Sequence, residues 1–123
     1  MITEDYVNFE TAKLLKEKGF DEECFALYNP DGILIQSGIR LNNIQVGRVK
    51  GSYSAPTLQM VMKWLREMHN LWIDIDPLAS YEWTWSIWFM NDPNFKMGES
   101  SQVISTYEEA VEEAIQYSLK NLI

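Results

Sequence analysis

Residues 71–90 decide the fold: Leu71-Trp-Ile-Asp-Ile-Asp76 and Trp83-Thr-Trp-Ser-Ile-Trp-Phe-Met90 are two runs joined by Pro77-Leu-Ala-Ser-Tyr-Glu82. Apolar and polar side chains alternate in the first run with the period of two that places neighbours on opposite faces of a strand. The second run is rich in tryptophan, a residue favoured in strands. The two runs and their proline-containing link predict two paired strands.

The pairing of these strands should keep the apolar side chains together, because a slip by one residue would bury Asp74 and Asp76. We expect Asp76 near Glu82, a register that puts Ile75 beside Trp83 and Ile73 beside Trp85. Trp72 and Trp88 then share the other face with both aspartates, as diagonal neighbours.

The face that carries Trp72 and Trp88 has two interpretations. If the third helix or the 37–54 segment covers it, the two rings are structural. If nothing covers it, an exposed aromatic pair is a candidate protein interface, because aromatic side chains carry much of the binding energy at such contacts. Asp74 and Asp76 would then suit a cationic partner.

Further elements follow from local signals. Asn8 and Gly19 bound a helix over about residues 8–18, and Asn29-Pro-Asp-Gly32 predicts a hairpin between strands 24–28 and 33–35. Residues 37–54 are read as a mobile loop or as a loop with a short strand at 44–49. Helical spacing predicts helices from Pro56 to His69 and from Thr106 onward, the last with the capping-box pair Thr106 and Glu109.

The order α-β-β-α-β-β-α predicts a single α+β domain over residues 1–123. We expect a four-stranded antiparallel sheet, made of two hairpins, with three helices packed mainly on one face.

Composition narrows the function classes. The chain has 123 residues, of which 46% are hydrophobic, and a net charge of −8, which disfavours broad nucleic-acid binding. The lone Cys24 excludes an intramolecular disulfide and a multi-cysteine zinc site. Glu4 and Asp5 are unlike a signal peptide, and no apolar run reaches the length of about 20 residues that a membrane span needs. A cytoplasmic protein without membrane partners is predicted.

The charge is unevenly distributed along the chain. From Gly32 to Arg66 there is no Asp or Glu, whereas five cations occur: Arg40, Arg48, Lys50, Lys63 and Arg66. These side chains either face the protein's own acidic helices or form a surface that contacts an anion or a nucleic acid, with Tyr53 or an exposed tryptophan stacking on bases.

Catalytic chemistry has little support. His69 is the single histidine, and no catalytic motif accompanies it or Cys24, which is placed in the middle of a strand. His69, Asp74, Asp76 and Glu82 are too weak a set to predict a metal site, and Gly47 to Gly51 lacks the ending of a phosphate-binding loop. We therefore predict no catalytic residues, no metal and no cofactor, and enzyme activity is the less favoured class.

Three stretches carry a resemblance to a known family: Tyr6-Val-Asn-Phe-Glu-Thr-Ala-Lys-Leu-Leu-Lys-Glu-Lys-Gly-Phe20, Thr57-Leu-Gln-Met-Val-Met-Lys-Trp-Leu-Arg-Glu-Met-His69 and Thr106-Tyr-Glu-Glu-Ala-Val-Glu-Glu-Ala-Ile115. Together they resemble a family of small proteins from gut bacteria, their mobile elements and phages, for which no activity is known. The resemblance covers about a third of the chain. It implies a bacterial or phage-infected cell as the setting, and it supplies no site residues.

The sequence thus favours a small acidic interaction or accessory protein of phage or mobile-element type, which binds another protein or itself as a homodimer. The alternative is a nucleic-acid-associated protein that uses the five cations of the 40–66 segment. A third interpretation is an acidic DNA mimic whose final helix presents Glu108, Glu109, Glu112 and Glu113.

Overall fold

In a computed structural model the chain divides into two compact units, residues 1–57 and residues 58–123. The structure describes the whole chain apart from the side chain of Pro93. The first unit contains α1 (Phe9–Glu17), β1 (Cys24–Tyr28), β2 (Leu34–Leu41), α2 (Asn43–Val46) and β3 (Tyr53–Ser54). The second contains α3 (Leu58–His69), β4 (Leu71–Pro77), β5 (Trp83–Phe89), β6 (Asp92–Glu99) and α4 (Tyr107–Asn121).

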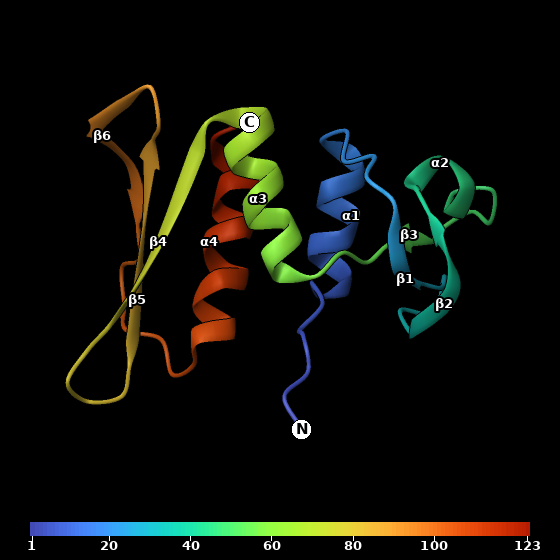
Figure 1. Cartoon of the computed structure of the whole chain (residues 1–123), viewed down its shortest axis with the longest axis horizontal. Helices are drawn as coiled ribbons and strands as arrows, with labels where there is room; N and C mark the ends of the chain where they lie inside the picture. The colour runs from blue at the N-terminus through green and yellow to red at the C-terminus, as the bar shows by residue number, and fades with distance from the viewer. The chain divides into compact units, whose positions relative to one another are not determined.

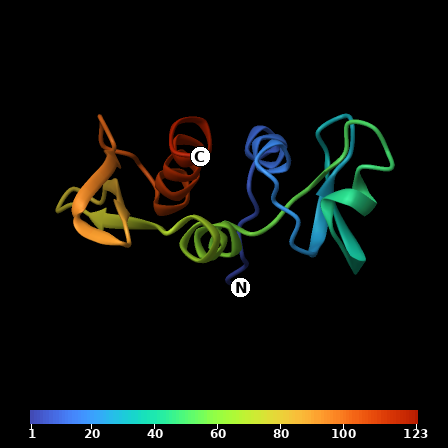
Figure 2. The same cartoon turned by 90° about the horizontal axis from the view of Figure 1, so that it is seen from above.

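The first unit is built on an antiparallel sheet with the order β2-β1-β3. Helix α1 packs beside this sheet, and both α1 and the short α2 contact β3 (Figures 1 and 2). The predicted hairpin of residues 24–35 is confirmed. Gly32 has the positive φ that its turn requires, and the side-chain oxygen of Asn29 accepts hydrogen bonds from two backbone amides of that turn, those of Asp31 and Ile33.

The segment that follows this hairpin is more structured than predicted. Strand β2 continues to Leu41, α2 begins there with a capping box between Asn42 and Gln45, and β3 follows. Buried Asn43 fixes the segment, since its side-chain amide donates to the Phe20 carbonyl at 2.8 Å and its oxygen accepts from the Ser54 amide at 2.8 Å. The alternative strand at 44–49 is therefore wrong, and of the predicted loop only Asn42 and residues 47–52, between α2 and β3, lack helix and strand.

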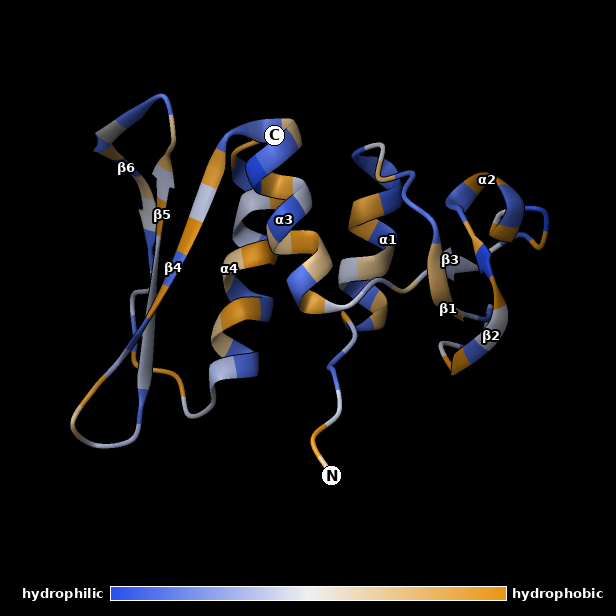
Figure 3. Ribbon diagram, in the orientation of Figure 1, coloured by the Kyte–Doolittle hydropathy of each residue, from blue (hydrophilic) through white to orange (hydrophobic). Residues whose placement is uncertain are grey.

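The second unit has the sheet order β4-β5-β6, with α3 and α4 on the same face (Figures 1 and 2). Hydrophobic and hydrophilic residues alternate along β4 (Figure 3), and Leu71 and Ile73 are buried on the helix-covered face. Helix α3 stops where Asn70 adopts φ 56°, and α4 starts where the Thr106 hydroxyl oxygen accepts from the Glu109 amide at 3.1 Å.

The predicted four-stranded sheet with three helices is wrong: the fold is α+β with two three-stranded antiparallel sheets and four helices. Strand β6 escaped prediction because bulges interrupt its pairing with β5, so its side chains do not keep a strict period of two. Strand β3 is only two residues long. Among the residues described, no helix combines the length and apolar character required to cross a membrane.

The β4–β5 pairing itself is confirmed, but its predicted register is wrong by two residues. Ile75 pairs with Trp85 and Ile73 with Ile87, and Asp76 lies opposite Thr84. A shift of two leaves every side chain on its predicted face. It also places Trp72 directly opposite Trp88 instead of diagonally.

Candidate functional site

The face of the second unit's sheet that lies opposite α3 and α4 is the candidate binding surface. Strand alternation turns the following side chains of β4 and β5 toward it: Trp72, Asp74, Asp76, Thr84, Ser86 and Trp88. Lys96 and Glu99 of β6 join them, because these residues pair with Trp88 and Ser86. We call these eight residues the open face.

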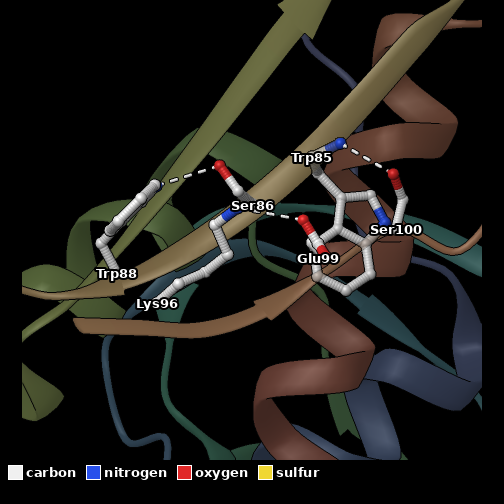
Figure 4. A network of polar contacts seen from close by, with 6 residues as sticks. All are labelled: Trp85, Ser86, Trp88, Lys96, Glu99 and Ser100. Atoms are coloured by element: carbon white, nitrogen blue, oxygen red, sulfur yellow. Dashed lines mark hydrogen bonds and ion pairs between the residues drawn. The ribbon is translucent and has the colours of Figure 1, made fainter. Parts of the chain in front are cut away.

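The two tryptophans form the aromatic part of the open face. Trp72 is 45% exposed and Trp88 is half-buried beside it. The indole nitrogen of Trp88 donates to the Ser86 hydroxyl at 3.0 Å, which fixes the orientation of that ring (Figure 4). The sequence-based expectation that Trp72 and Trp88 share one face with Asp74 and Asp76 is in agreement with this pairing.

Each ring already has a cation beside it. The guanidinium of Arg66, from α3, lies 5.4 Å from the ring centroid of Trp72, and the Lys96 ammonium lies 5.2 Å from that of Trp88. Lys96 also pairs with Glu99 at 3.0 Å (Figure 4). Both arrangements are cation–π contacts, so the chain's own side chains show that these rings accept a positive group.

A shallow hollow of about 320 Å³ opens beside these side chains. Its lining includes the carboxylates of Asp74, Asp76 and Glu99, together with Ser86 and the Trp88 ring. Three carboxylates against the single ammonium of Lys96 leave the hollow negative. Its chemistry therefore suits an incoming cationic side chain that packs its stem on an aromatic ring.

Buried Trp85 is the support beneath the open face. Its backbone amide donates to the Ser100 hydroxyl at 3.2 Å, and its indole nitrogen donates to Glu113 of α4 at 3.1 Å (Figure 4 shows the first of these bonds). The Tyr117 ring packs against it with centroids 5.2 Å apart. These contacts hold β5, and with it Ser86 and Trp88, against the helix layer.

The five predicted anion-binding cations are divided between the units. Arg40, Arg48 and Lys50 belong to the first, and Lys63 and Arg66 to the second. Two of them lie over aromatic rings of their own unit, Arg40 over Phe25 at 5.5 Å and Arg66 over Trp72. Neither unit therefore carries the whole predicted set.

Cys24 and His69, the two side chains considered for catalysis, are packed against their neighbours in the fold. Burial, with a smaller contribution from Glu22, raises the pKa of the Cys24 thiol to about 12, so the nucleophilic thiolate is scarce at neutral pH. Partial burial lowers the pKa of His69, whose ring packs edge-on against Trp64 with centroids 4.7 Å apart. In the part of the chain that the structure describes, no three His, Cys, Asp or Glu side chains gather as metal ligands.

Sequence reasoning missed Lys96 and Glu99 because it did not predict β6. The available signal was weak: Phe95 and Met97 alternate with Asn94 and Lys96 directly after a strand, but Gly98 then ends the pattern. The pairing of Ser86 with Glu99 and of Trp88 with Lys96 depends on bulges that residue types alone do not reveal.

Comparison of the chain with protein-family models, with curated proteins and with solved structures found no match. The site is therefore interpreted from its own geometry.

Proposed function

We propose that this chain is a binding protein whose open face recognises a basic segment of a partner protein. The observation that carries the proposal is Trp72, 45% exposed and directly opposite Trp88 on a sheet face that neither α3 nor α4 covers. Large aromatic side chains that remain accessible beside polar neighbours are typical of protein-binding surfaces.

Electrostatics supports a basic partner. The second unit carries ten Asp and Glu against four Lys and Arg, and Asp74, Asp76 and Glu99 lie on the open face itself. A surface of this sign speeds the encounter with a cationic segment and repels an acidic one.

The two kinds of side chain have different roles in the proposed interaction. A tryptophan buried at the centre of an interface is commonly worth about 2 kcal/mol or more when truncated, whereas an exposed ion pair contributes roughly 0.2–1 kcal/mol. Trp72 and Trp88 therefore set the affinity. Asp74, Asp76 and Glu99 set the preferred charge of the partner and make binding sensitive to salt.

The test uses a short fluorescent peptide of alternating arginine and leucine as the probe, with fluorescence anisotropy as the readout. Replacement of both tryptophans by serine should abolish binding, whereas Tyr81→Asn should not. Tyr81 is a suitable control because it is a 91% exposed aromatic residue in the β4–β5 turn with φ 62°, a conformation that asparagine tolerates. Undiminished binding by the folded Trp72→Ser, Trp88→Ser variant would refute the proposal.

A homodimer that uses the same tryptophans is the other version of this interface. Light scattering coupled to size-exclusion chromatography distinguishes the two. A dimer that the double tryptophan variant disrupts would mean that the open face is occupied by a second copy rather than by a different protein.

The setting that we propose is the cytoplasm of a bacterium or phage-infected bacterium, with the protein as an accessory factor. Support for this setting comes from the resemblance carried by residues 6–20, 57–69 and 106–115.

A nucleic-acid-associated protein is the second candidate, favoured by the cations Arg66 and Lys96 beside the rings of Trp72 and Trp88 on an open sheet face. Stacking of bases on such rings is a common mode of single-strand binding. This candidate predicts binding of a single-stranded oligonucleotide that weakens steeply with salt. Absence of binding even at low salt would eliminate it.

A further inference from the structure

The two sheets have four edge strands, and three of them have features that discourage pairing with another chain; in β3 the Ser54 amide already donates to the buried side chain of Asn43. Strand β3 is two residues long, β4 contains Asp74, Asp76 and Pro77, and β6 contains Asp92, Lys96 and Glu99. Short strands, charges and prolines are the usual protection of sheet edges. Strand β2 differs, because no charged residue and no proline occurs from Leu34 to Ile39.

The backbone of β2 offers free hydrogen-bonding groups along this edge. In antiparallel pairs, residues that bond to the partner strand alternate with residues that face away from it. The Ile33 carbonyl accepts from the Asn29 amide, and Leu27 pairs with Ile35 two residues further on. Leu34 and Gln36 therefore direct their amides and carbonyls to the free edge. Beyond Gln36 the regular pairing with β1 ends, and the Ser37 hydroxyl donates to the Ile39 carbonyl and accepts from the Ile39 amide.

Apolar side chains lie beside this regularly paired part of β2. Ile33 is 58% exposed, Ile35 42% and Phe25 of the neighbouring strand 53%. Leu27 pairs with Ile35, so the side chains of β1 and β2 form a continuous apolar strip on that face. A strand added along Leu34 to Gln36 would cover part of the strip with its own alternate side chains.

The charged side chains near this strip indicate which kind of partner it would bind. The first unit as a whole carries eight Asp and Glu against six Lys and Arg, but its 32–57 stretch has three cations, Arg40, Arg48 and Lys50, and no acidic residue. The Arg40 guanidinium lies over the Phe25 ring, at the end of the strip away from the turn, whereas Asp31 occupies the turn. A second copy would bring the same cations to the contact. An acidic partner is complementary, with its carboxylates toward the Arg40 end.

We propose that the edge of β2 binds an extended acidic segment of another protein by strand addition, with alternate apolar side chains of that segment on the Ile33 and Ile35 strip. The partner backbone pairs with Leu34 and Gln36. This surface is distinct from the open face of the second unit and prefers the opposite charge. The two proposals can therefore fail independently.

The experiment compares two labelled peptides of equal length, one alternating valine with glutamate and the other alternating valine with lysine. We expect the glutamate peptide to bind at least several-fold more tightly and to slow hydrogen exchange at the Leu34 and Gln36 amides. Equal binding of both peptides, or protection confined to β4 and β6, would overturn the proposal. So would protection of Leu34 and Gln36 that rises with protein concentration alone, because a second copy would then occupy the edge.

Two variants with matched controls complete the test. Arg40→Glu should weaken binding of the glutamate peptide by several-fold more than Arg48→Glu, which makes the same charge change in the same unit. Gln36→Pro removes one amide from the free edge without removing a bond to β1, so it should abolish strand addition while leaving the unit folded. Unchanged binding by folded Gln36→Pro contradicts the proposal, and if this variant does not fold, the exchange measurement on the natural sequence decides.

Discussion

Lys96 occupies the position that an incoming cation would take on the open face. Its replacement should therefore lower the stability of the fold and raise the affinity for a basic partner. Its ammonium contacts the Trp88 ring and pairs with Glu99 at 3.0 Å, while the two side chains of the pair are 41% and 64% exposed. At such exposure a cation–π contact contributes about 0.5–1 kcal/mol and an ion pair roughly 0.2–1 kcal/mol. Lys96→Gln should therefore cost only about 1 kcal/mol of unfolding free energy.

The same substitution should strengthen binding of a basic peptide. A basic partner that binds the natural sequence must first break the contacts of Lys96. In Lys96→Gln these contacts are already absent, so the binding free energy should improve by about 1 kcal/mol, or roughly fivefold in affinity. Anisotropy titration with the arginine–leucine peptide measures the change, and urea unfolding measures the stability. Lys63→Gln is the matched control, because it removes one charge from the same unit on an exposed position of α3. If Lys96→Gln binds no better than Lys63→Gln, the reasoning about displacement is refuted.

Three further predictions concern the framework. Gly98→Ala should lose about 1–3 kcal/mol of stability, because an added Cβ would lie 2.5 Å from Cε1 of Tyr117; unfolding in urea that matches the natural sequence would contradict this. Asn43→Ala leaves the Phe20 carbonyl and the Ser54 amide without their buried partner, so amides of the first unit should exchange faster by hydrogen-exchange mass spectrometry, with a loss of about 2–4 kcal/mol. Burial raises the pKa of the Cys24 thiol from 9.0 to about 12 in the fold, so the neutral thiol stabilises the fold below pH 9 and this contribution is lost as pH rises toward 12. Relative to Cys24→Ala, the natural sequence should lose about 1 kcal/mol between pH 9 and pH 10, and parallel pH dependences of the two proteins would contradict the raised pKa of the thiol.

Local signals in the sequence were sufficient where one residue type determines a conformation. Asn8 caps α1, Gly32 supplies the positive φ of the first hairpin and Thr106 caps α4, as predicted. The faces of β4 and β5 also followed from their alternation. Each of these features depends on neighbours a few residues apart.

Pairing between segments was harder to predict. The apolar pattern allowed several even shifts between β4 and β5, all of which bury the same faces, so it could not select the pairing of Ile73 with Ile87. At residues 43–46 the capping box favours a helix, whereas Ile44 and Val46 favour a strand. The helix forms because Asn43 is buried and hydrogen-bonds to Phe20 and Ser54, which lie far from it in the sequence. The candidate site was found in part, since Trp72 and Trp88 were predicted and Lys96 was not.

The most direct test of the central claim is a ¹⁵N NMR titration with the arginine–leucine peptide, following the indole N–H signals of the five tryptophans. We expect the Trp72 and Trp88 signals to shift together and saturably, while that of Trp64, which is buried in α3, keeps its position. Shifts confined to other tryptophans, or saturable binding that leaves Trp72 and Trp88 unmoved, would contradict recognition through the open face.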